Sequence, residues 1–257
     1  MNNVRRTERE RSASQALSFV ALVVLIIGAL LVLDGPAPAM EVKRVEDEAV
    51  GSDAVARAVV SERLVLPEPS REGTVSVEEA INGRLSVRTF ADEPVSLADL
   101  SQILWAAQGK TKSGGRAAPS AGALYPIELF VATGRVTGAP AGLYRYRPAS
   151  HELQVVRIED VRPALSDAAL SQDWVADAAA VIVIGAVPGR TESKYGGRAE
   201  RYVHIEVGAV AENIYLQTGA LGLGTVFVGA FSDDDVAGIV DGSDVEPFGL
   251  MPIGALP

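Results

Sequence analysis

The pattern of hydrophobic and polar positions predicts that helices and strands alternate from about residue 71 onward. Between residues 97 and 107, apolar side chains recur three or four positions apart, as on one face of an α-helix. Ser96 and Gly109 stand where the cap and the stop of that helix are expected. A capping box at Ser76 predicts a shorter helix through Ile81.

The rest of this region extends the alternation. Short runs rich in Val and Ile predict buried strands, and a long apolar face predicts a helix that breaks at Gly222. The predicted strands are 127–132, 143–147, 153–156, 181–187 and 225–229, and the predicted later helices are 200–221 and 233–240. We therefore expect an α+β fold with a mixed sheet under long helices.

An apolar segment near the start of the chain has a different character. Residues 16–33 carry no charged side chain and are long enough to cross a bilayer. Residues 1–15 are basic, which predicts an N-terminus in the cytoplasm and a membrane-anchored, extracytoplasmic domain. There are two alternatives: a cleaved signal, because small residues follow at 37–39, and a domain that faces the cytoplasm, because Lys43 and Arg44 follow the segment. Prolines and mixed charges predict a linker over 34–70, followed by the domain at 71–257.

Composition limits the chemistry that this domain can perform. Among 257 residues there is no cysteine and there are two histidines, which excludes a disulfide, a thiol nucleophile and a three-histidine metal site. The formal net charge of −10 argues against a nucleic-acid partner. No metal site is expected, so any redox chemistry requires a bound cofactor.

Three stretches carry candidate chemistry. In the first, Arg84, Ser86 and Arg88 alternate, so an extended backbone would project two guanidiniums and a hydroxyl to one side, where they suit a phosphate monoester. A solvated basic strand is the alternative. The second, residues 118–126, holds small residues between prolines, which is typical of a fixed loop that a flat ligand can approach closely, or of an ordinary turn. In the third, Lys194 and Tyr195 can stabilise negative charge and move a proton, or lie in a surface loop.

Together these stretches resemble the nitroreductase superfamily, in particular its SagB/ThcOx-type dehydrogenase branch. The resemblance covers residues 64–254. The matching runs are RLSVRTF at 84–90, LSQILWAAQGK at 100–110, APSAGALYP at 118–126, KYG at 194–196, NIYLQTGALGLGTVFVGAF at 213–231 and MPIG at 251–254.

The resemblance implies a homodimeric flavoprotein with FMN at the subunit interface. Arg84, Ser86 and Arg88 would hold the phosphate and ribityl chain. The flavin would be bordered by Pro119, Ser120 and Ala121 of the partner subunit and, near its N5 atom, by Val228, Gly229 and Ala230. Lys194 and Tyr195 match a pair implicated in catalysis in members that oxidise peptide thiazolines and oxazolines.

The expected function is therefore that of an FMN-dependent oxidoreductase that transfers hydride through flavin N5, with NAD(P)H as a possible electron donor. Two alternatives stay open. One is a generic NAD(P)H-dependent nitro or quinone reductase. The other is a non-catalytic flavin-binding partner protein. The substrate would be a small molecule or a peptide.

Overall fold

The computed structural model describes residues 62–242 and 244–257. The predicted basic segment 1–15, the predicted membrane anchor 16–33 and most of the predicted linker lie outside these residues. Within the described part, no helix is both long and apolar enough to cross a membrane. The longest described helix, Ala199–Ala220, has 22 residues but carries charged side chains, among them Glu200, Arg201 and Glu206. This finding contradicts the expected membrane-anchored, extracytoplasmic location, which we do not retain.

A seven-stranded sheet forms the centre of the domain, in the order β1-β6-β5-β3-β7-β9-β8. Its strands are β1 (Arg63–Val65), β3 (Ile127–Thr133), β5 (Gly142–Arg147), β6 (Glu152–Arg157), β7 (Ala180–Ala186), β8 (Leu223–Thr225) and β9 (Glu246–Ala255). The neighbouring strands of this sheet pair antiparallel. A parallel pair, β2 (Val95–Ser96) with β4 (Val136–Thr137), forms a separate small sheet.

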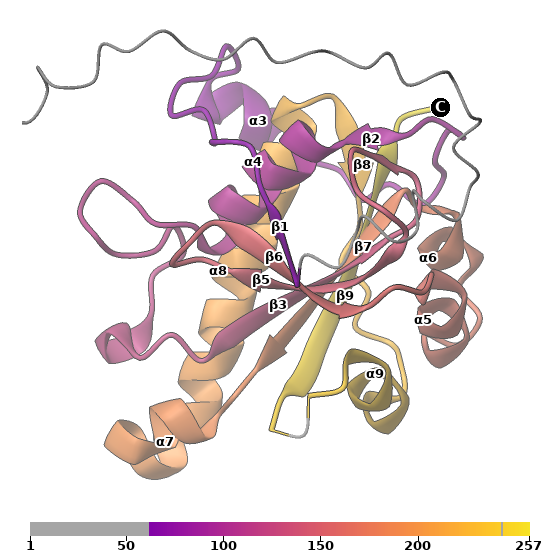
Figure 1. Ribbon diagram of the computed structural model, residues 1–257. Coiled ribbons are helices and arrows are strands. Elements are labelled where there is room, and N and C mark those ends of the chain that lie inside the picture. The colour runs from indigo at the N-terminus through magenta and orange to yellow at the C-terminus, as the bar shows by residue number, and fades with distance from the viewer. Residues whose placement is uncertain (1–61, 243) are drawn as a thin grey trace, which may run out of the picture. The chain divides into compact units, whose positions relative to one another are not determined.

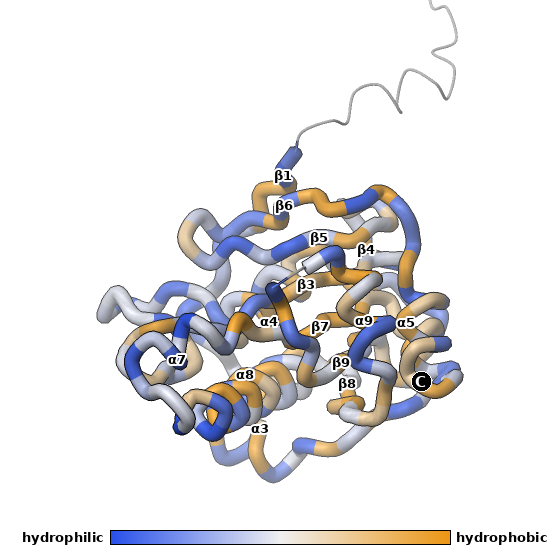
Figure 2. The backbone as a smooth tube through the Cα atoms, turned by 90° about the horizontal axis from the view of Figure 1, so that it is seen from below, coloured by the Kyte–Doolittle hydropathy of each residue, from blue (hydrophilic) through white to orange (hydrophobic). Residues whose placement is uncertain are grey.

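Helices cover both faces of the large sheet (Figure 1). They are α3 (Val77–Gly83), α4 (Leu97–Gln108), α5 (Arg162–Ala168), α6 (Asp173–Asp177), α7 (Gly189–Tyr195), α8 (Ala199–Ala220) and α9 (Asp233–Val240). On β7, Ile182 and Ile184 join the core under α4 and α8, whereas Val181 and Val183 join the core under α5 and α9. Because side chains alternate along a strand, a strand covered on both faces is apolar at every position. Figure 2 shows this hydrophobic stretch of β7 in the middle of the domain.

The helix caps predicted at Ser76 and Ser96 form. The Ser76 hydroxyl accepts from the Glu79 N–H at 3.1 Å, and the Ser96 hydroxyl accepts from the Asp99 N–H at 3.0 Å. Each bond satisfies a donor at a helix start that has no partner inside the helix.

Three differences from the sequence expectations concern strands. β9 was not predicted, because its prolines and glycines hide the strand pattern, although it lies between β7 and β8. β8 ends at Thr225, where the predicted strand begins, and Val228 makes only an isolated bridge to Leu250. β1 falls within the predicted linker, so the sheet begins before residue 71.

Candidate functional site

The segment that follows α3 brings the first candidate residues to the surface. It is neither helix nor strand, and the Val87 N–H donates to the Thr225 carbonyl at 2.8 Å, which joins it to the end of β8. Arg84 and Arg88 are exposed, and within the described residues neither forms an ion pair with a carboxylate. Two guanidiniums without an anionic partner provide the charge and the donors that bind a phosphate.

Tyr215, in the second half of α8, connects this segment to the chain after β8. Its hydroxyl lies 3.0 Å from the Ser86 hydroxyl and accepts from the Phe227 N–H at 2.7 Å. The Arg84 guanidinium lies 5.2 Å from the centre of the Tyr215 ring. We call Arg84, Ser86, Arg88, Tyr215 and residues 227–230 the phosphate-side cluster. Its connections were not predicted, because a single tyrosine within a long helix has no spacing that marks it as functional.

The predicted flavin-edge residues differ in what they expose. Val228 is buried, and both its N–H and its carbonyl are hydrogen bonded to Leu250. Gly229 and Ala230 are exposed, and the Ala230 carbonyl accepts from the Gln172 side chain at 3.0 Å. Of the three, only Gly229 and Ala230 can therefore present backbone to a ligand.

The loop at 118–126 has an unusual backbone. It contains a short 3-10 turn at Ala121–Ala123, and the Ser120 hydroxyl accepts from the Tyr125 N–H at 2.9 Å. Gly122 has a φ of 62°, and the non-glycine residues Ala123 and Tyr125 have φ values of 55° and 50°. Such left-handed conformations in non-glycine residues cost energy and occur often at functional sites. Pro119 is exposed, and Ser120 and Ala121 are partly exposed.

Lys194 and Tyr195 lie against this loop. A Cβ atom placed on Gly122 would come within 2.9 Å of both the Lys194 Nζ and the Tyr195 hydroxyl oxygen. The Lys194 Nζ is 5.5 Å from the centre of the Tyr195 ring, which makes an edge contact with Tyr202 at 4.8 Å. The pair occupies the last turn of α7 rather than a surface loop, and the helix ends at Gly196, whose φ is 51°. The structure thus joins two stretches that the sequence separates by about seventy positions.

An ion-pair network holds α7 to the loop. Arg190, in α7, donates to the Tyr125 carbonyl at 2.9 Å and to Glu128 of β3 at 2.6 Å. Arg145 donates to the second oxygen of Glu128 at 3.0 Å. Burial opposes ionisation of Glu128, but the hydrogen bonds from the two arginines outweigh it and lower the pKa of this carboxyl. An ionised Glu128 therefore fixes Arg190, and with it the position of Lys194.

Behind the loop lies a buried carboxyl, Glu206 of α8. Its side chain is 3% exposed, and its Oε1 atom has no hydrogen-bond partner among the described residues. Burial raises the pKa of Glu206, while the Ser120 hydroxyl, the Arg116 guanidinium and the Gln108 amide favour its charged form. Arg116 also donates to Gln108 at 3.0 Å and lies over the Tyr125 ring. The sequence singled out Ser120 but did not connect it to Glu206, because the members of the network come from separate elements. We call the loop 118–126 with Arg190, Lys194, Tyr195 and Glu206 the loop-side cluster.

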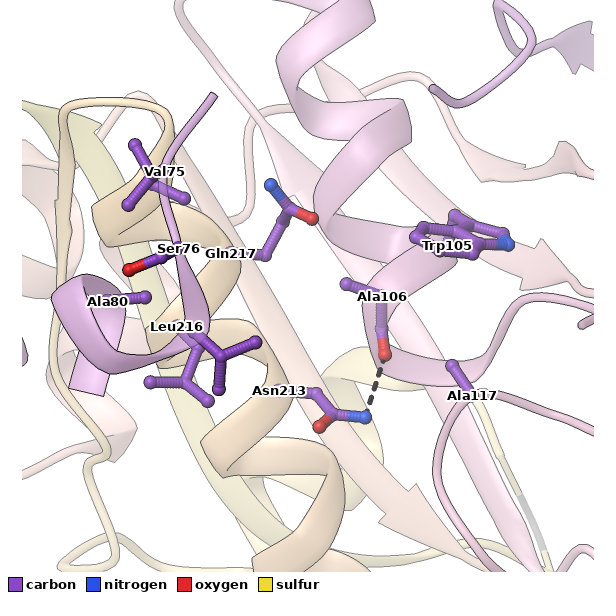
Figure 3. Close-up of a pocket in the computed structure, with 11 residues that line it drawn as sticks. Val75, Ser76, Ala80, Trp105, Ala106, Ala117, Asn213, Leu216 and Gln217 are labelled. Carbon is purple, nitrogen blue, oxygen red and sulfur yellow. Dashed lines mark hydrogen bonds between the residues drawn. The ribbon is translucent and has the colours of Figure 1, made fainter. Parts of the chain in front are cut away.

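Two cavities lie near these clusters. One of about 300 Å³, between α3, α4 and α8, is lined mainly by apolar side chains. Figure 3 shows that its Asn213 amide is committed to the Ala106 carbonyl, with a bond of 2.9 Å. None of the predicted site residues lines it. A second cavity of about 400 Å³ borders Gly229 and Phe248, beside Asp233 and Glu246. The second cavity therefore gives the exposed backbone at Gly229 room for a ligand.

The comparisons with known proteins agree with this arrangement. The chain belongs to the nitroreductase family, whose sequence model matches residues 81–255. Members of this family are oxidoreductases, and the predicted α+β nitroreductase-like fold is confirmed. The SagB-type branch lies beyond what the family match establishes.

Three relatives define the similarity more closely. A protein of Methanocaldococcus jannaschii that is named as a nitroreductase is 43% identical over 181 residues, which cover 70% of this chain and 91% of the relative. A crystal structure from Ralstonia eutropha, also named as a nitroreductase, has 33% identity and a TM-score of 0.68 and covers 86% of this chain and 99% of its own. The Escherichia coli microcin synthetase McbBCD complex with truncated pro-MccB17 contains a chain with 22% identity and a TM-score of 0.59, over 83% of this chain and 85% of that one. At that identity the similarity concerns the fold alone.

Proposed function

We propose that this chain is an FMN-dependent oxidoreductase of the SagB dehydrogenase type, which oxidises azoline rings in a peptide. The observation that carries the proposal is the packing of Lys194 and Tyr195 against Gly122, because it assembles an ammonium, a phenol and a small-residue loop. The fold similarity to a chain of the microcin synthetase complex supports a peptide substrate without establishing one.

The residues of the phosphate-side cluster fit FMN. Arg84, Ser86 and Arg88 would hold the phosphate and the start of the ribityl chain, since the two guanidiniums are exposed and unpaired in the described part of the chain. Each charge-assisted hydrogen bond of this kind contributes about 1.5–3 kcal/mol. Gly229 and Ala230 would present exposed backbone to the ring. When bound, FMN would supply an acceptor for a hydride at its N5 atom.

The loop-side cluster supplies the remaining chemistry. Conversion of an azoline to an azole removes one hydride and one proton from the ring. When bound, FMN would supply the hydride acceptor, and the Tyr195 oxygen would take up the proton as its phenolate, the form of this side chain that can accept one. The Lys194 ammonium, whose Nζ lies 5.5 Å from the centre of the Tyr195 ring, would stabilise the negative charge that develops nearby. Pro119, Ser120 and Ala121 of one subunit would border the flavin bound by the other.

A homodimer is the assembly that this proposal requires, and exposed apolar groups on two helices support it. Ile205 on α8 is 63% exposed, and Gly208, one turn later, faces open space. Val77 and Ile81 on α3 are 66% and 57% exposed. Exposed apolar residues that gather on one face are typical of an interface. Because Lys194 and Tyr195 pack on Gly122 of their own chain, each loop that borders a flavin brings its own Lys–Tyr pair.

The test uses the full chain reconstituted with FMN and a synthetic peptide that contains one thiazoline. We expect wild-type protein to bind FMN and to form the thiazole with an artificial electron acceptor. Lys194→Ala and Tyr195→Phe should keep FMN binding and lose about 100-fold or more in thiazole formation, the range typical of a lost acid–base group. Lys112→Ala, which removes an exposed lysine outside both clusters, is the control.

The outcomes separate the candidate functions. Unchanged thiazole formation in both variants would refute the Lys–Tyr chemistry. If wild-type protein reduces nitro compounds or quinones with NAD(P)H and leaves the peptide untouched, the generic reductase is the better assignment. Flavin binding without turnover of either kind would instead favour a non-catalytic partner.

A further inference from the structure

Tyr215 contacts three segments that are distant in sequence. From the second half of α8, its hydroxyl reaches Ser86 at 3.0 Å and the Phe227 backbone at 2.7 Å, and its ring underlies Arg84. The Phe227 ring is itself held close to β9, since a Cβ atom on Gly249 would lie 2.4 Å from it. Tyr215 thus connects Arg84 and Ser86 to Phe227, whose ring lies against β9.

The direction of the hydrogen bonds follows from the groups involved. The Phe227 N–H can only donate, so the Tyr215 oxygen is an acceptor in that bond. The single hydrogen of Tyr215 is then free for Ser86, and a phenol is a stronger acid than an alkyl hydroxyl and hence the better donor of the two. Ser86 therefore accepts from Tyr215 and keeps its own hydrogen for another acceptor. Hydrogen bonds in such a chain polarise one another, so the last donor becomes stronger.

The Tyr215 ring acts on Arg84 separately. The guanidinium lies 5.2 Å from the ring centre, within the range of a cation–π contact, and Arg84 is otherwise exposed. A long side chain loses conformational freedom when it binds a ligand, and a ring that restricts it beforehand lowers that cost. No aromatic ring is in cation–π contact with Arg88 among the described residues.

We propose that Tyr215 is a positioning residue that orients the Ser86 hydroxyl and the Arg84 guanidinium toward a phosphate monoester. This inference rests on the proposed binding of FMN, because the phosphate is that of the cofactor. It assigns to Tyr215 a role in affinity for the phosphate and none in the transfer of hydride.

Comparison of FMN with riboflavin, which lacks the phosphate, tests the inference. The dissociation constants of both flavins are measured by quenching of flavin fluorescence on the full chain. We expect Tyr215→Phe, which keeps the ring, to weaken FMN about 10-fold and riboflavin less than about twofold, since one hydrogen bond to a charged group is affected. Tyr215→Leu, which also removes the ring, should weaken FMN further. Tyr144→Phe, which removes a hydroxyl bonded to Pro140, should change neither.

A double variant tests whether Tyr215 acts through Ser86. If it does, Ser86→Ala combined with Tyr215→Phe binds FMN no more weakly than Ser86→Ala alone. If the losses of FMN affinity in the two single variants add up in the double variant, Tyr215 does not act through Ser86. Equal weakening of both flavins by Tyr215→Phe would reveal a general structural role and overturn the proposal, as would unchanged FMN binding. Failure of the wild-type chain to bind either flavin would instead refute the proposed function on which the inference depends.

Discussion

Replacement of Gly122 by alanine isolates the contact between the loop and the Lys–Tyr pair. Gly122 has a φ of 62°, and a Cβ atom there would lie 2.9 Å from both the Lys194 Nζ and the Tyr195 oxygen. Ordinary contacts between side-chain atoms lie near 4 Å. Both side chains must therefore move away from the loop by roughly 0.5–1 Å, because contact distances below about 3.4 Å are strongly repulsive.

The substitution should have a small effect on stability and a larger effect on turnover. An alanine in the left-handed backbone conformation destabilises the folded state by about 1–2 kcal/mol. The lower conformational entropy of the unfolded chain offsets about 0.4–1 kcal/mol of that loss. The net loss of stability is then about 1 kcal/mol, or a fall in Tm of roughly 2–4 °C. A displacement of about 1 Å in a reacting group can reduce the rate by about 100-fold. We expect kcat of Gly122→Ala to fall 10- to 100-fold.

Gly114→Ala is the matched control. Gly114 also has a positive φ, of 84°, but an added Cβ there meets nothing within 4 Å. It carries the same backbone strain without the collision. Thermal unfolding and steady-state kinetics of both variants, with an azoline peptide as substrate, distinguish the effects. If Gly122→Ala retains the turnover of Gly114→Ala at a similar Tm, the contact does not position Lys194 and Tyr195, and the reasoning is refuted.

Two further predictions concern stability and assembly. The His151 ring lies 2.8 Å from the Tyr146 hydroxyl and 2.7 Å from the Ser101 hydroxyl, and burial lowers its pKa. The unfolded chain therefore binds a proton at His151 more readily than the folded chain does. As a result, stability falls as the pH drops below about 6.5. His151→Asn, which tolerates the positive φ but does not titrate, should lose less Tm between pH 7.5 and 5 than wild type; an equal loss would assign the effect to other groups. Ile205→Glu should give a monomer by light scattering, whereas Ile158→Glu, with similar exposure, should stay dimeric; a dimer in both variants would exclude this face of α8.

The elements that the sequence predicts well are those whose signals are local. The α4 and α8 helices show apolar faces in their own residues, and the caps at Ser76 and Ser96 need only the next three positions. β9 has no such signal, because its glycines have a tertiary purpose. Added Cβ atoms on Gly249 and Gly254 would collide with the rings of Phe227 and Phe90. In isolation these glycines indicate a turn, and only the folded chain explains them.

The same distinction between local and tertiary signals holds for the candidate site. The resemblance identified Arg84, Ser86, Lys194 and Tyr195 by motif, but it does not say which of them meet. That depends on contacts such as Gly122 with Lys194, which join residues far apart in the chain. Glu206 and Tyr215 were missed because a polar residue within a long helix has no spacing that marks it as functional.

The two clusters are anchored to different parts of the fold, and this bears on how their variants can be separated. The phosphate-side cluster is joined to β8 by the bond from the Val87 N–H to Thr225, and to β9 by the backbone bonds between Val228 and Leu250. The loop-side cluster is tied to β3 by Arg190 and Glu128. Substitutions at distant sites without shared partners have nearly additive effects. Variants of Ser86 or Tyr215 should therefore change FMN affinity, and variants of Lys194 should change turnover, because no hydrogen bond or ion pair among the described residues links Tyr215 to Lys194.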